Sequence, residues 1–251
     1  MRSKILAIVE VLALLLCLLF VGGKLAALFA KPLKIPEQAS PIVFQWIPLV
    51  VCAWLLDRWL RGRSPFSWGL KSSGSILENC QASARLLFLG GVLPMLVTWS
   101  SVGDSGELFD GMTTGFALLA PLLGQEIYMA GFGQRRLSDS YQPLAVAGLI
   151  ASLFVLAHAG HAADGAKGIV FLLLMGWQGL VWSAARSAKI SLYPLLAAHF
   201  ILLICYMYPG PGLITVVLAG MLAGPGMLNW LKKLAGVLIA RPKADVAESY
   251  R

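Results

Sequence analysis

Glutamate and histidine side chains stand in stretches of this chain that are otherwise almost entirely apolar. Glu126 lies in the middle of one such run, His158 follows Phe-Val-Leu-Ala near the end of another, and His199 lies inside a third. An ionisable group in apolar surroundings at membrane depth costs at least about 2.5 kcal/mol, so it needs a partner, a water-filled cavity or a function. Glutamate and histidine are the groups that general acid–base catalysis and zinc binding use.

The spacing of these groups favours one shared site. The chain has three histidines, and His158 and His161 stand three residues apart, which places them on one face of a helix if the helix continues that far. A single buried histidine is often only a hydrogen bond between helices. A glutamate and histidines on three separate helices instead form the kind of constellation that a helix bundle uses for catalysis or metal binding. His161 borders a Gly/Ala/Asp loop, and we interpret it as an interface residue.

The composition defines the elements that must position these residues. The chain is 58% hydrophobic and 13% charged over 251 residues, with a mean hydropathy of +0.77. Several apolar runs match the length of about 20 residues that crosses a bilayer, and long runs without alternation favour helices. We predict an all-α polytopic membrane bundle that forms one domain over residues 1–251. Its eight spans are expected at about 5–29, 41–57, 82–101, 113–134, 143–161, 167–186, 191–208 and 212–231.

The basic residues predict how the bundle is inserted. The net charge of +8 is spread in short clusters beside the apolar runs, which indicates topology signals and a lipid partner rather than a nucleic-acid surface. The clusters alternate so that both termini are expected in the cytoplasm, with the chain integral to a cell membrane of the bacterial inner-membrane type. The first apolar run is similar to a signal peptide, but we interpret it as a retained first helix because further spans follow.

Three short motifs contain Glu126, His158 and His199. They appear in order as Gln125-Glu126-x-x-x-Ala130-Gly131, Phe154-x-x-x-His158 and His199-x-x-x-Leu203. In this respect the chain, over about residues 112–206, resembles the CAAX protease and bacteriocin-processing family of intramembrane endopeptidases, also called the Abi family. The pattern of that family is Glu-Glu-x-x-x-Arg-Gly, Phe-x-x-x-His and His-x-x-x-Asn.

The resemblance implies a glutamate-dependent peptidase that needs no metal or other cofactor. Carried over, Glu126 and His158 would activate water, and His199 would stabilise the oxyanion of the tetrahedral intermediate. The implied partner is a membrane-anchored peptide or protein substrate. Because His158 is expected near the outer end of its helix, we expect the cavity to open outward, toward an exported or membrane-inserted tail.

Departures from the family pattern keep two other functions open. Gln125 stands at the first glutamate position, and Ala130 and Leu203 replace the arginine and the asparagine. If the attacking water depends on the first glutamate, the chain is inactive and keeps only a binding or immunity role. A metal-dependent hydrolase is the other alternative, with ligands drawn from Glu126 and the three histidines, although the chain lacks a His-Glu-x-x-His signature.

Overall fold

The computed structural model describes residues 2–35, 40, 42–71, 74–101, 122–207, 209–224 and 226–239, and all regular structure in these ranges is helical. The all-α prediction is therefore confirmed. The elements are α1 (Arg2–Phe29), the π-helix η2 (Ile42–Trp46), α2 (Ile47–Arg61), the 3-10 helix η3 (Pro65–Trp68), α3 (Ile76–Ser101), a helix at 122–126 that continues into the π-helix η4 (Ile127–Gly133) and α5 (Gln134–Ser138), α6 (Pro143–Ala157), the 3-10 helix η5 (Ala159–Asp164), α7 (Ala166–Ser187), α8 (Leu192–Met207), α9 (Pro209–Ala223) and α10 (Gly226–Ile239).

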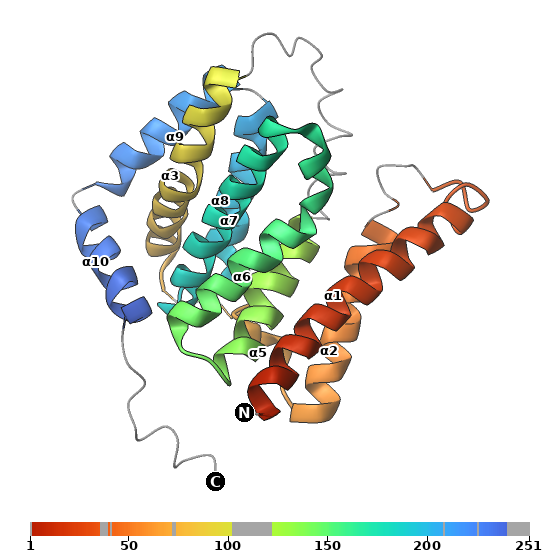
Figure 1. Cartoon of the computed structure of the whole chain (residues 1–251). Coiled ribbons are helices and arrows are strands. Elements are labelled where there is room, and N and C mark those ends of the chain that lie inside the picture. Colours follow the sequence, from red (N-terminus) through yellow and green to blue (C-terminus); the bar gives the residue numbers. More distant parts are fainter. Residues whose placement is uncertain are drawn as a thin grey trace.

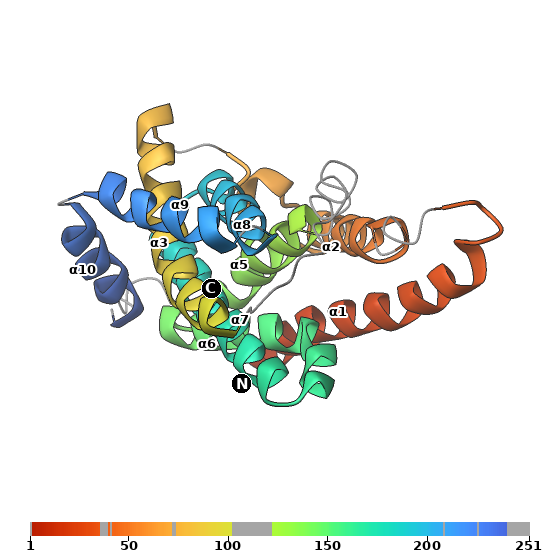
Figure 2. The same cartoon turned by 90° about the horizontal axis from the view of Figure 1, so that it is seen from above.

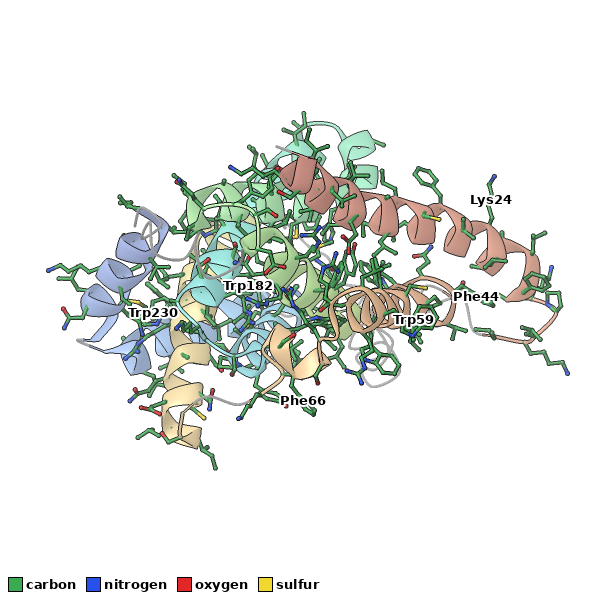
Figure 3. All side chains as sticks on the ribbon, turned by 90° about the horizontal axis from the view of Figure 1, so that it is seen from below. Lys24, Phe44, Trp59, Phe66, Trp182 and Trp230 are labelled. Atoms are coloured by element: carbon green, nitrogen blue, oxygen red, sulfur yellow. The ribbon has the colours of Figure 1, made fainter. Side chains whose placement is uncertain are left out.

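The helices form a bundle around α7. On one flank α1 and α2 run side by side, and on the other flank α3 packs against α8 and α9 (Figures 1 and 2). Between the flanks, α7 contacts α3, α6 and η4. Trp182 of α7 is wholly buried near the middle of the bundle, whereas Trp59 and Phe66 lie at its edge with 79% and 68% of their surface exposed (Figure 3).

Three of the described helices are long and apolar enough to cross a membrane: Ser3–Phe29, Val43–Arg61 and Gly168–Ser187. Large apolar side chains such as Phe20 and Leu28 are exposed on α1, as expected for a surface that faces hydrocarbon. The predicted span at 113–134 lies partly outside the described residues, since description resumes at 122. The number of eight spans stays a prediction.

Two predicted helices end where the sequence pattern did not place their ends. The predicted span at 143–161 is too long, because α6 stops at Ala157 and its C-cap His158 leaves the helical conformation with φ −109° and ψ 10°. The predicted single helix at 212–231 is wrong. There α9 ends at Ala223, Gly224 takes a φ of +58°, and the following helix is bent by 87°. Glycine adopts this left-handed conformation without steric cost, so the chain turns there.

The helix that contains the first motif is locally a π-helix. Residues 122–138 run without a break, but the seven residues of η4 have the wider π geometry, and six of them are buried. Small residues allow this close packing: a Cβ on Gly131 would lie 3.2 Å from Leu192 Cδ1. Turns of π-helix inside α-helices occur frequently at functional sites.

An ionic network holds the C-terminal part of that helix, α5, against α1 and α2. Glu10 accepts hydrogen bonds from Arg61 (2.5 Å) and Arg136 (2.8 Å). Arg61 also contacts Asp57 at 3.1 Å, and Asp57 accepts the indole N–H of Trp68 at 2.8 Å. Through these two arginines, Glu10 joins α1 to α2 and α5.

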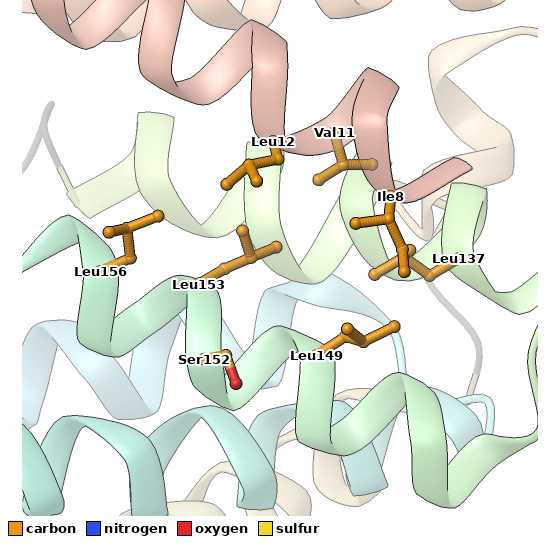
Figure 4. A pocket seen from close by; sticks show the side chains of 8 residues that line it. All are labelled: Ile8, Val11, Leu12, Leu137, Leu149, Ser152, Leu153 and Leu156. Atoms are coloured by element: carbon orange, nitrogen blue, oxygen red, sulfur yellow. The ribbon is translucent and has the colours of Figure 1, made fainter. Parts of the chain in front are cut away.

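An apolar groove lies between α1 and α6. Ile8, Val11 and Leu12 of α1 face Leu149, Leu153 and Leu156 of α6 across a cavity of about 140 Å³ (Figure 4). Among the described residues of its wall Ser152 is the one with a polar side chain, and its hydroxyl donates to the carbonyl of Gly148 at 2.9 Å. The groove therefore offers no group for chemistry and is suited to apolar chains.

Candidate active site

Glu126 is the most deeply buried carboxylate of the motif region. It has no exposed surface and lies at the point where the helix at 122–126 passes into η4, with helical φ and ψ. Its Oε1 accepts the indole N–H of Trp182 at 2.9 Å and lies 2.5 Å from Nδ1 of His199. A buried carboxylate is tolerated only where donors replace its hydration, and these two bonds supply that replacement.

His199 and Trp182 reach this carboxylate from two other helices. His199 lies on α8 and Trp182 on α7, and their rings meet edge to face with centroids 6.0 Å apart. The contact between Nδ1 of His199 and Oε1 fixes the ring orientation and leaves Nε2 for another contact. The structure thus brings two of the predicted site residues, Glu126 and His199, into direct contact.

The second oxygen of Glu126 has a different environment. Among the described residues, Oε2 is buried and has no hydrogen-bond partner. Buried polar atoms are nearly always satisfied by protein or ordered water, so an atom in this position is suited to hold a water or a substrate group. One oxygen of the carboxylate is therefore anchored and the other is available.

Two buried glutamine side chains add to this polar interior. Gln125 is 7% exposed, and its Nε2 has no partner in the described part of the chain. Gln178 of α7 is wholly buried, and neither its Nε2 nor its Oε1 bonds to a described residue. Gln178 stands four residues before Trp182, so both side chains share a face of α7. The sequence analysis missed Gln178 and Trp182.

His158 lies at the end of α6 rather than inside a helix. Its Nδ1 lies 2.8 Å from the carbonyl oxygen of Phe154, and its ring meets Phe171 of α7 edge to face at 5.8 Å. A carbonyl only accepts, so Nδ1 carries the hydrogen and Nε2 of the neutral ring is an acceptor. Because α6 has ended, His158 and His161 do not share an α-helical face as predicted, and the side chain of His161 lies outside the described residues.

The two other motif departures have clear structural settings. Ala130 is wholly buried, and its carbonyl accepts the Nε of Arg186 at 3.0 Å. An arginine from α7 therefore lies against the motif helix at the position where the family pattern carries an arginine on that helix. Leu203 is half-buried on α8, one turn after His199. Within the described ranges, no group of three or more His, Cys, Asp or Glu side chains is placed to hold a metal ion.

The residues missed by the sequence analysis gave weak signals. Trp182 stands in an apolar helix, where a tryptophan is far more often a packing residue than a hydrogen-bond donor to a carboxylate. Gln178 and Arg186 lie on the same helix, at intervals of four residues on either side of Trp182. That polar stripe at helical spacing in an apolar span was the available signal.

Comparison with known proteins supports the motif assignment. Residues 110–205 match the family model described as type II CAAX prenyl endopeptidase Rce1-like. No curated protein and no solved structure matches the chain. The matched segment runs from before Glu126 to beyond His199 and includes all three motifs. The match confirms the resemblance to the CAAX protease family over residues 110–205.

Proposed function

We propose that this protein is an intramembrane endopeptidase that hydrolyses a peptide bond in a membrane-anchored or exported substrate, using water activated by Glu126 and histidine. The observation that carries the proposal is the buried contact of 2.5 Å between Glu126 and His199 from two separate helices. The Rce1-like match over residues 110–205 supports the same class of reaction. The chemistry requires no metal or other cofactor.

The proposed reaction assigns one role to each oxygen of Glu126. Trp182 and His199 hold Oε1, while Oε2 accepts a proton from the attacking water and Nε2 of His158 accepts its second hydrogen bond. The water oxygen then bonds to the substrate carbonyl carbon, and the carbonyl electron pair moves onto oxygen. Glu126 returns its proton to the amide nitrogen as the C–N bond breaks, which yields a carboxylate and an amine.

His199 is proposed to serve the oxyanion. Its Nδ1 is committed to Glu126, so a protonated ring presents its Nε2–H to the oxygen that becomes negative. A donor fixed in a buried, water-poor site stabilises such a transition state far more than the same donor in water, by about 3 to 4 kcal/mol for one oxyanion-hole bond. The family pattern adds an asparagine one turn later, and Leu203 offers no such donor.

A cleavage assay tests the proposal. The purified protein in lipid bilayers is incubated with membrane-anchored peptides, beside the variants Glu126→Gln, His158→Ala and His199→Ala. We expect cleavage by the parent protein and its loss in each variant, with His161→Ala as the matched histidine control that retains it. Cleavage that persists in Glu126→Gln or His158→Ala would overturn the mechanism.

A non-catalytic binding or immunity role is the second candidate, favoured by one observation. Gln125 replaces the first family glutamate, and an amide does not accept a proton from water at neutral pH. The variant Gln125→Glu separates the two functions. A rate increase in this variant supports a peptidase that works below its family's capacity, and no cleavage in either protein supports the binding role.

The side from which substrate enters is proposed to be the outer one, with both termini in the cytoplasm. His158 lies at the C-terminal end of α6, and the exposed Ala159 follows it at the start of η5. A cysteine introduced at Ala159 should react with an impermeant maleimide added from outside intact cells. The parent protein, with its four cysteines, is the control for background labelling. Labelling from the cytoplasmic side alone would overturn this orientation.

A further inference from the structure

A polar cavity lies where η3, α5 and the end of α7 meet, and Glu126 is not among its lining residues. Its volume is about 490 Å³. Four basic side chains line it together with serine hydroxyls and Gln134, and the described lining contains no acidic residue; the four are Lys71, Arg135, Arg186 and Lys189. Its walls are therefore positively charged, in contrast to the apolar groove between α1 and α6.

Arg186 gives this cavity a fixed charge. Its guanidinium donates to three backbone carbonyl oxygens: Nε to Ala130 at 3.0 Å, Nη2 to Trp68 at 2.7 Å, and Nη1 to Ile190. Carbonyls orient the group but do not neutralise it, and none of these acceptors is a carboxylate. Two of its five N–H groups are left over after these three bonds. A rigid planar donor of this kind matches phosphate oxygens.

One acidic residue close to this wall has a shorter contact elsewhere. Asp139 lies 3.9 Å from Arg135, but it forms the shorter contact of 2.7 Å with Arg63. The described partners of the Arg186 guanidinium, in contrast, are backbone carbonyls. A cation held in this way in a concave site attracts an anion, because the low-dielectric walls concentrate its field.

The position of the cavity suggests how a phosphate group would reach it. Its lining segments belong to loops that the distribution of basic residues assigns to one side of the membrane. Phe66, which is 68% exposed, forms part of the wall, and aromatic rings at this depth typically lie among lipid headgroups. A phosphate group at the membrane surface could therefore enter the cavity from the side of η3.

We propose that this cavity binds a phosphate group, carried by an anionic lipid headgroup or by a soluble phosphate. Arg186 supplies donors of fixed orientation, and Lys71 and Lys189 add positive charge to the lining. The proposal does not depend on peptidase activity, because no residue assigned to catalysis lines the cavity.

Lipid titration of the full-length protein in detergent tests the proposal. Phosphatidylglycerol, phosphatidylcholine and inorganic phosphate are added separately, and binding is followed by native mass spectrometry and by the unfolding temperature. The test variant is Lys71→Gln with Lys189→Gln. The matched control is Lys232→Gln with Lys233→Gln, which removes the same charge from exposed positions on α10. Unfolding without ligand checks that each variant folds.

The expected result is saturable binding of phosphatidylglycerol that weakens at least about tenfold in the cavity variant and stays unchanged in the α10 control. Saturable binding of inorganic phosphate with the same dependence on Lys71 and Lys189 would support the site and identify a soluble ligand. Equal binding of phosphatidylcholine, equal loss in both variants, or no saturable binding of any probe would overturn the proposal.

Discussion

The indole N–H of Trp182 points at the same carboxylate oxygen that His199 contacts, at 2.9 Å from Oε1 of Glu126. The two donors meet one oxygen from separate helices, so the direction of the carboxylate is set by α7 and α8 together. Each donor can be removed without removing the carboxylate, and the consequences differ in ways that can be measured.

Trp182→Phe keeps an aromatic ring and deletes the donor. Because a hydrogen bond to a charged acceptor contributes about 1.5 to 3 kcal/mol, we expect kcat/KM for peptide cleavage to fall at least about tenfold. The matched control is Trp177→Phe, whose indole donates to the carbonyl of Leu89 at 2.8 Å, outside the site. Equal losses of activity in the two variants would contradict the role of Trp182.

The contact between Glu126 and His199 predicts strong coupling between their substitutions. His199→Ala and Glu126→Gln should each lower the cleavage rate at least about a hundredfold, the scale for the loss of a key polar group in an active site. If the two act as a unit, the double variant should be about as slow as the slower single variant. A double variant whose loss equals the product of the single losses would indicate independent roles.

Substitution of Gln178 is expected to change thermal stability and the rate of cleavage in opposite directions. Its amide is buried without a described partner, so Gln178→Met, which keeps the side-chain length, should leave thermal stability unchanged or higher. If the amide holds water in the polar interior beside Trp182, the same variant should cleave peptide about five- to tenfold more slowly. Unchanged kcat/KM in Gln178→Met would show that the amide has no part in the reaction.

Substitution of Glu10, which lies outside the candidate active site, is expected to lower the stability of the fold. Its carboxylate is shared by Arg61 and Arg136, so Glu10→Gln removes the anion that Arg136 contacts and leaves Arg61 with Asp57. Breaking a buried ionic pair in this way costs about 3 to 5 kcal/mol. Asp139→Asn disrupts the more exposed contact with Arg63, for which about 1 kcal/mol or less is expected. Chemical denaturation of both variants in the same detergent provides the comparison.

The sequence indicated where helices exist more reliably than where they end. Apolar runs of membrane length predicted α1, α7 and α8 within a few residues, since a chain in hydrocarbon must satisfy its backbone internally. The end of α6 at Ala157 was missed because alanine, glycine and histidine there do not interrupt the apolar pattern. The bend after Ala223 had a signal in the dipeptide Gly224-Pro225, whose weight was underestimated because such residues are tolerated in membrane helices.

The candidate site was predicted in part for a similar reason. The rarity of ionisable groups in apolar segments identified Glu126 and His199, because burying such groups is costly in any fold. The choice of His199 rather than His158 as the direct partner of Glu126 depends on how α8 packs against the motif helix. The contacts of Trp182 and Arg186 with the motif helix depend on how α7 is rotated about its axis. That rotation cannot be predicted for a helix that is apolar on most of its surface.

The π-helical segment Ile127–Gly133 sets both the spacing and the relative direction of the side chains at its two ends. Glu126 stands before it, and Arg136, which binds Glu10, stands after it. Each residue advances an α-helix by about 100° and 1.5 Å. Deletion of one residue between them would therefore turn the carboxylate away from α8 or pull the arginine off α1. The length of this segment is therefore constrained as well as its buried side chains, because a change in residue number would put its two ends out of phase.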